Sequence, residues 1–149
     1  MAVELTAVLP QTVQPGQNVL FTETPIPCAK GYVVHRKGAG IVTLRGANCQ
    51  CKARYKVTFG GNISLPTGTA ISPISVAFAI GGESLPSTAM TVTPAAVENA
   101  FNVSRTTFID VPCGCCTTIA VENVSVAVGT TPAPAIVVEN ANLTVERVA

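Results

Sequence analysis

The protein has 149 residues, a formal net charge of +1, 48% hydrophobic residues and only 11% charged residues. Such a small net charge gives no general affinity for nucleic acids or acidic membranes, so we expect neither as a partner. No apolar run approaches the roughly 20 residues that span a bilayer. The first residues lack the basic and apolar segments of a secretion signal, so we expect synthesis in a cytoplasm. The length suits a single domain, which we expect to cover residues 1–149.

The scarcity of charged side chains predicts contacts between subunits. A typical soluble domain has about 25% charged residues, and a small monomer with far fewer would expose much apolar surface. Large exposed apolar surfaces usually mark interaction sites. Alternatively, the many Thr, Ser and Asn residues keep a monomer soluble.

The order of apolar and polar residues predicts about ten short strands. Side chains of an extended segment alternate between two faces, and turns rich in Pro, Gly and Asn separate such segments here. The β-rich segments are 3–9, 18–22, 31–34, 40–44, 51–59, 62–65, 74–80, 90–93, 102–111, 118–128, 136–138 and 143–148. Residues 95–101 are expected to form a loop, and Asn123 to mark a bulge. This spacing is typical of an all-β sandwich or barrel.

The clearest strand runs from Cys51 to Phe59. Its alternation predicts one apolar and one basic face, formed by Ala53, Tyr55, Val57 and Phe59 on one side and by Lys52, Arg54, Lys56 and Thr58 on the other. Gly60-Gly61 is predicted to supply the positive φ angles of a tight turn after it.

A second alternating strand covers residues 74–80. Ile74, Val76, Phe78 and Ile80 share one face, and the other face carries only Ser75, Ala77 and Ala79. Such a small, uncharged face is expected where another sheet or subunit approaches closely. Gly81-Gly82 is predicted to turn the chain after this strand.

Four segments resemble the trimeric jelly roll of tumour necrosis factor and complement proteins, including versions on phage particles and at the tips of collagen-like spore filaments. The matching segments are Thr12–Phe21, Gly38–Leu44, Ala53–Phe59 and Ala77–Met90. The third matches the family pattern Gly-x-Tyr-x-Val-x-Phe, with Ala53 in place of Gly. The fourth matches a hairpin whose turn is usually Asn-Gly.

The resemblance implies an antiparallel jelly-roll sandwich that forms a homotrimer, with an inner sheet facing the three-fold axis. By analogy, Tyr55, Phe59 and Phe78 would lie in the core or at that axis and form the trimer core. The collagen-like stalk of many spore and complement proteins does not occur in this sequence. Fold alone does not establish function.

Six cysteines are candidates for disulfides, for a metal site or for buried free thiols: Cys28, Cys49, Cys51, Cys113, Cys115 and Cys116. Residues two apart in a strand share a face, so Cys49 with Cys51 and Cys113 with Cys115 could present paired thiols. Zinc knuckles usually have Cys-x2-Cys spacing, which these pairs lack. Disulfides require an oxidising setting, which a particle protein can meet after release.

No catalytic constellation can be identified in the sequence. His35 is the single histidine, and an exposed loop position is a better interpretation than a pair with Cys28, because no orienting acid or nucleophile motif is nearby. The glycine pairs are not followed by the Lys-Ser/Thr of a phosphate loop. We therefore expect no enzyme activity and no cofactor.

The best functional candidate is a basic cluster that would bind an acidic partner. Its members are Lys30, Arg36, Lys37, Lys52, Arg54 and Lys56. The competing interpretation is an ordinary solvated sheet face. Nucleic acid is a poorer partner, because base-stacking aromatic residues are scarce.

These observations lead to a first hypothesis, a non-enzymatic protein that binds the outer shell of a phage capsid as a trimer and reinforces it. It would be located on the virion surface, with the major capsid protein or another shell protein as its partner. The second hypothesis is a jelly-roll binding module of a bacterial spore or cell surface, crosslinked by its cysteines. The third is a cysteine-metal protein or an enzyme of unfamiliar type.

Overall fold

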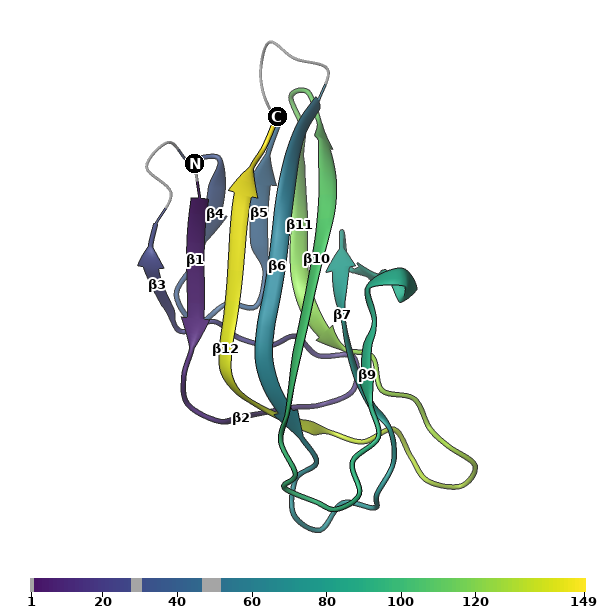
Figure 1. The fold of residues 1–149 in the computed structure, drawn as a ribbon. Coiled ribbons are helices and arrows are strands. Elements are labelled where there is room, and N and C mark those ends of the chain that lie inside the picture. Colours follow the sequence, from purple (N-terminus) through teal and green to yellow (C-terminus); the bar gives the residue numbers. More distant parts are fainter. Residues whose placement is uncertain (1, 28–30, 47–51) are drawn as a thin grey trace.

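The computed structural model describes residues 2–27, 31–46 and 52–149, which form two antiparallel β-sheets packed face to face (Figure 1). The first sheet has the order β10-β6-β12-β1-β3, with β2 also paired to β12. Its strands are β1 (Ala2–Ala7), β2 (Gln11–Val13), β3 (Glu23–Ile26), β6 (Lys52–Ser64), β10 (Phe101–Pro112) and β12 (Ile136–Arg147).

The second sheet has the order β4-β5-β11-β7-β8, with β9 also paired to β7. Its strands are β4 (Val33–His35), β5 (Val42–Arg45), β7 (Ile74–Ile80), β8 (Glu83–Ser84), β9 (Met90–Val92) and β11 (Cys116–Asn123). A single 3-10 turn, η1 (Pro86–Thr88), precedes β9, and the described residues contain no α-helix. No helix in this part of the chain has the length and apolar character needed to cross a bilayer. The expected antiparallel all-β sandwich is confirmed.

The central strand alternates as predicted but is longer than predicted. The side chains of Tyr55, Val57 and Phe59 are fully buried, while Lys52, Arg54 and Lys56 are exposed. The prediction of a turn at Gly60-Gly61 was wrong, because β6 continues through both glycines to Ser64, paired with β10. A side chain on Gly61 would begin only 3.1 Å from the ring of Phe59, so the glycine makes room for that ring.

The core between the sheets contains the three aromatic residues expected at the trimer axis. Tyr55, Phe59 and Phe78 are each 0% exposed within a single chain, so they have no surface to offer a second copy. The assignment of these three residues to a trimer core was therefore wrong, and they belong to the core of each subunit. The Tyr55 hydroxyl donates a hydrogen bond of 2.6 Å to the carbonyl of Arg45, which ties the end of β5 to the core.

Several boundaries differ from the sequence prediction. The two expected C-terminal strands are one strand, β12, in which Asn140 takes a positive φ of 51° where the register with β6 shifts. Residues 18–22 form only an isolated bridge from Asn18 to Glu122. The Gly81-Gly82 turn is confirmed, with φ angles of 62° and 89° that glycine tolerates.

Asn123 is a buried clamp and not a bulge. It is the last residue of β11, and its side-chain amide donates to the carbonyls of Val13 and Pro134 at 2.9 and 3.1 Å. Its carbonyl oxygen accepts a hydrogen bond of 3.0 Å from the backbone of Ser125. One fully buried side chain therefore joins three segments of the chain.

Replacing Asn123 with Ala should destabilise the fold, because three buried backbone groups lose their partner. Each buried polar group left unsatisfied costs about 1–3 kcal/mol. We therefore expect the free energy of unfolding, measured by urea denaturation, to fall by more than about 2 kcal/mol. The exposed Asn99 is the matched control, since Asn99→Ala should change the free energy of unfolding by less than about 0.5 kcal/mol. Equal stabilities of the two variants would contradict the clamp.

Candidate interaction site

The outward side of the first sheet carries a largely uncharged polar surface on the three neighbouring strands β10, β6 and β12, with Glu139 of β12 opposite Asn62. We call it the polar face; it consists of Thr58, Gly60, Asn62, Asn102, Ser104, Thr106, Asn142 and Thr144. These residues alternate with the buried core residues of the same strands, which fixes their outward direction. Glu4 of β1 lies at its border, opposite Thr144.

The polar face is held by hydrogen bonds within one chain. Thr58 lies opposite Thr106 on one side and Thr144 on the other, and the hydroxyls of Thr58 and Thr106 are 3.0 Å apart. Asn102 donates to Asn62 at 3.1 Å. Because these groups already have partners, another surface can cover them without breaking bonds to the sheet.

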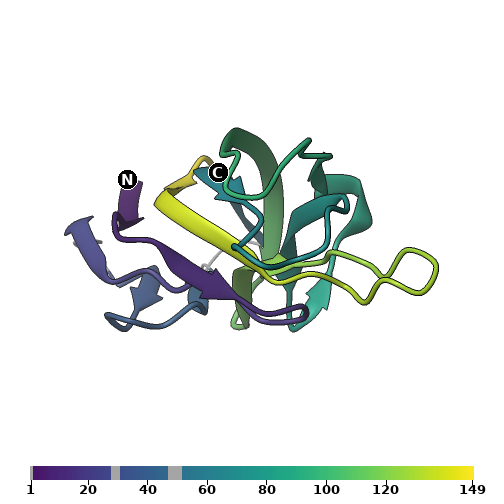
Figure 2. The same cartoon turned by 90° about the horizontal axis from the view of Figure 1, so that it is seen from below.

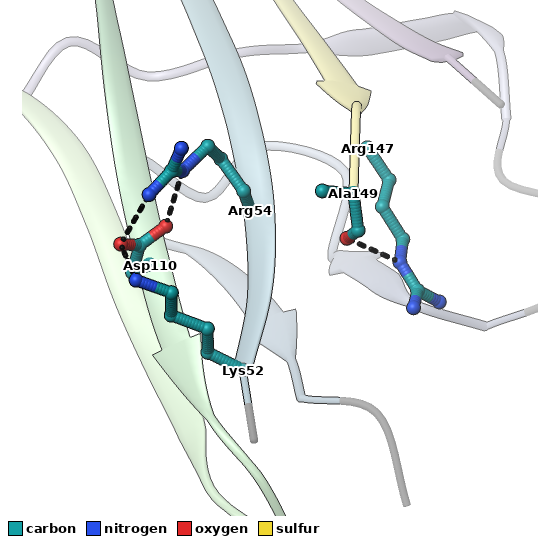
Figure 3. A network of polar contacts seen from close by, with 5 residues as sticks. All are labelled: Lys52, Arg54, Asp110, Arg147 and Ala149. Carbon is teal, nitrogen blue, oxygen red and sulfur yellow. Dashed lines mark hydrogen bonds and ion pairs between the residues drawn. The ribbon is translucent and has the colours of Figure 1, made fainter. Parts of the chain in front are cut away.

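Towards one end of β6 the same side of the sheet becomes charged. Figure 3 shows Asp110 of β10 between the side chains of Arg54 and Lys52 of β6. Arg54 binds the carboxylate with two hydrogen bonds, 2.8 and 3.0 Å long, and the Lys52 ammonium lies 3.2 Å away. The hydrogen bonds from Arg54, with a smaller contribution from Lys52, lower the pKa of Asp110 from 3.8 to about 2.

Both chain termini lie at this end of the sandwich (Figure 1). Ala2 is paired with Glu146, and the backbone of Arg54 binds the backbone of Val148 and Ala149. The guanidinium of Arg147 lies 4.6 Å from the centre of the Tyr32 ring. We call this region the terminal end; its cations are Arg45, Lys52, Arg54 and Arg147.

The predicted basic cluster is divided between the two sheets. Lys56 lies on β6 with Lys52 and Arg54, opposite Phe108 of β10 and Glu146 of β12. Arg36 and Lys37, in contrast, belong to the link between β4 and β5 in the second sheet. The ammonium group of Lys37 lies 3.7 Å from the carboxylate of Glu23 in β3. Lys30 is outside the described residues.

Phe108 is a candidate interaction residue that the sequence analysis missed. Its side chain is 59% exposed beside the polar face, on an otherwise polar side of β10. A sequence signal did exist: Val103, Ile109 and Val111 define the buried face of β10, and Phe108 has the opposite parity. An exposed aromatic ring is a common anchor of protein interfaces.

The described cysteines lie at the terminal end, Cys113 and Cys115 in the tight turn between β10 and β11 and Cys116 as the first residue of β11. Cys113, Cys115 and Cys116 are all exposed, and Gly114 takes a φ of 71° between them. The Gly46 backbone donates to the carbonyl of Cys115 at 2.9 Å, so β5 is attached to this turn. Cys28, Cys49 and Cys51 lie outside the described residues.

His35, the residue considered for catalysis, takes part in the hydrogen bonding of the fold. His35 ends β4 and is partly buried, not an exposed loop residue; it lies 3.0 Å from both the Thr24 hydroxyl and the Ala39 carbonyl. Among these residues no three His, Cys, Asp or Glu side chains are grouped to hold a metal ion.

Comparison with solved structures identifies the fold. The globular domain of the zebrafish complement 1qA protein matches over 99% of this chain and 97% of its own, with a TM-score of 0.61 and 11% sequence identity. Pika GITRL covers 100% of this chain and 97% of its own, with a TM-score of 0.47 and 11% identity. No protein-family model and no curated protein sequence matches the chain. The protein therefore has the fold of the complement 1qA globular domain.

The pairing of Asp110 makes a testable prediction about its titration. Arg54→Met removes the largest cause of the lowered pKa, so the pKa of Asp110 should rise from about 2 towards 3.8, whereas Lys52→Met should raise it less. Because the folded pKa is the lower one, the stabilisation from this pair is present above the unfolded pKa and disappears as the pH falls through about 2. NMR titration of the Asp110 carboxyl carbon measures this, and an unchanged pKa in Arg54→Met would contradict the pairing.

Proposed function

We propose that the protein is a non-enzymatic structural component that binds the outer shell of a phage-type capsid as a trimer and reinforces it. The observation that carries the proposal is the polar face, a broad and largely uncharged surface on the outside of β10, β6 and β12. The resemblance to tumour necrosis factor and complement jelly rolls implies that the inner sheet of such a domain faces a three-fold axis. In this proposal the first sheet is that inner sheet.

The chemistry of the polar face suits contact between copies of the chain. Burying charged groups is costly unless each one is well paired, and the residues of the polar face are uncharged, with the carboxylates of Glu4 and Glu139 beside them. Its hydroxyl and amide groups hydrogen-bond to one another within the chain, so little is lost when water leaves. Phe108, beside it, supplies apolar area that a second copy can cover.

The terminal end is the part of each subunit that would contact the shell. Its cations Arg45, Lys52, Arg54 and Arg147 outnumber the neighbouring carboxylates of Asp110 and Glu146. A positive surface repeated three times around an axis is complementary to an acidic surface, and such contacts speed association. Clamping of neighbouring shell proteins by one trimer would reinforce the shell.

Introducing a charge at the centre of the polar face should separate the trimer. We expect the wild-type protein to have about three times the 15.3 kDa mass of one chain in light scattering coupled to size-exclusion chromatography. Thr58→Arg places an unpaired cation between Thr106 and Thr144 and should shift the mass towards a single chain. The control is Thr93→Arg, at an exposed residue after β9, which should leave the mass unchanged. A trimer that survives Thr58→Arg would contradict this use of the polar face.

Reversing charges at the terminal end should weaken binding to particles. The double variant Arg45→Glu with Lys52→Glu should bind purified phage particles roughly tenfold more weakly in co-sedimentation, and added salt should weaken the wild type in the same way. Arg105→Glu is the control, since Arg105 binds the Ser87 carbonyl away from the terminal end. Mass spectrometry of particles made in the host tests the whole proposal, and absence of the protein from them would refute it.

The exposed thiols favour a second candidate, a spore or cell-surface module crosslinked through cysteine. Free cysteines are usually buried, whereas Cys115, before β11, and Cys116, at its start, are exposed. Non-reducing gels of protein isolated from its source distinguish the two candidates. Covalent oligomers would support the second candidate, and uniformly free thiols would support the first.

A further inference from the structure

The outward side of the second sheet contains a pocket of about 330 Å3 over β11 and β7. Figure 2 looks along the strands of Figure 1 and shows this sheet on the side of the core away from β12, which is drawn in yellow. Thr118, Ala120 and Glu122 of β11 line the pocket. They point outward because the intervening Ile119 and Val121 are buried between the sheets. The pocket is therefore on the opposite side of the sandwich from the polar face.

The floor of the pocket is apolar. Ala120 lies directly opposite Ala79 of β7, and the two side chains are 5% and 3% exposed although neither belongs to the core between the sheets. Ile41 adds a larger apolar side chain to the lining. The Gly81-Gly82 turn also lines the pocket, and its lack of side chains leaves space there for another chain. An alkyl chain lying across these residues would remove apolar area from water.

Among the described residues that line the pocket, Glu122 carries the one charge. Its side chain is partly buried and forms no ion pair or hydrogen bond with any described residue. Asn18 lies opposite Glu122 in an isolated bridge and also lines the pocket. A cation bound here would pair with a carboxylate that has no counter-charge in its own chain, and the side-chain carbonyl of Asn18 can accept a second hydrogen bond.

The outward residues of β11 determine the order of chemical groups along the pocket. Glu122 supplies a negative charge, Ala120 a methyl group and Thr118 a hydroxyl, spread over about 13 Å of strand at about 3.3 Å per residue. A lysine residue has the complementary order, an ammonium group with three donors, an alkyl stem and a peptide backbone. A quaternary ammonium group fits less well, because aromatic rings usually bind such groups and none of the described lining residues is aromatic.

We infer that the pocket binds a lysine side chain of a partner protein, with its ammonium group at Glu122 and its alkyl stem over Ala79 and Ala120. The peptide backbone of that lysine then lies towards Thr118 and the Gly81-Gly82 turn. The site uses no residue of the polar face and does not depend on binding to a capsid. It is therefore open in a single chain and in the proposed trimer alike.

NMR titration of the wild-type protein with small probes tests this site. The probe is N-acetyl-lysine N-methylamide, and the backbone amide signals of Gly82, Ala120 and Glu122 are followed. We expect saturable shifts at these residues, with a dissociation constant in the millimolar range. The matching norleucine compound lacks the ammonium group and should bind roughly tenfold more weakly. This comparison needs no variant, so it remains decisive if a substitution disturbs folding.

Glu122→Gln keeps the shape of the side chain and removes its charge, so it should weaken binding of the lysine probe roughly tenfold. The matched control is Glu83→Gln, because Glu83 of β8 is an exposed carboxylate that does not line the pocket. Glu83→Gln should leave the affinity unchanged, and circular dichroism should show both variants folded.

Three results would overturn the inference. The first is the absence of shifts at the pocket, or equal affinities of wild type and Glu122→Gln for the lysine probe. The second is binding of n-butylammonium as tightly as the lysine probe, which would assign the pocket to free amines. The third is tighter binding of the corresponding arginine compound, which would assign it to a guanidinium group. None of these results bears on the mass of the protein in solution, which tests the proposed trimer separately.

Discussion

The structure depends on the register in which β6 pairs with the strands on its two sides. All of β6 from Lys52 to Ile63 is paired with β10, and most of it is also paired with β12. Because side chains alternate along a strand, a slip by one residue would put the basic residues into the core and Tyr55 and Phe59 into water. The same register that buries these rings therefore creates the polar face and places Arg54 opposite Asp110.

Much of this fold follows from the sequence because β-strand alternation is a local property. The two faces of β6 could be assigned from residue spacing alone, and the structure agrees with that assignment. In β7 the small residues Ala77 and Ala79 of the second face are buried as well. Gly60-Gly61 was misassigned because a glycine pair is typical of a tight turn and is unfavourable inside a strand. In the structure both glycines pair with β10, and local spacing does not identify β10 as their neighbour.

The candidate site was less predictable because it is assembled across strands. The exposure of Lys52 and Arg54 follows from alternation, but their pairing with Asp110 requires that β10 lie next to β6, although 56 residues separate Arg54 from Asp110. The separation of Arg36 and Lys37 from this region likewise reflects the assignment of strands to sheets. The buried position of Tyr55, in contrast, follows from its parity within β6, and placing it at an intersubunit axis relied on analogy.

The hydrogen bonds within the polar face separate folding of the chain from its proposed association with other copies. Thr58 is bonded to Thr106 and Asn102 to Asn62 before any second molecule arrives. These bonds therefore do not require a second copy of the chain. In the proposed trimer, association would be a separate step that follows folding and depends on protein concentration.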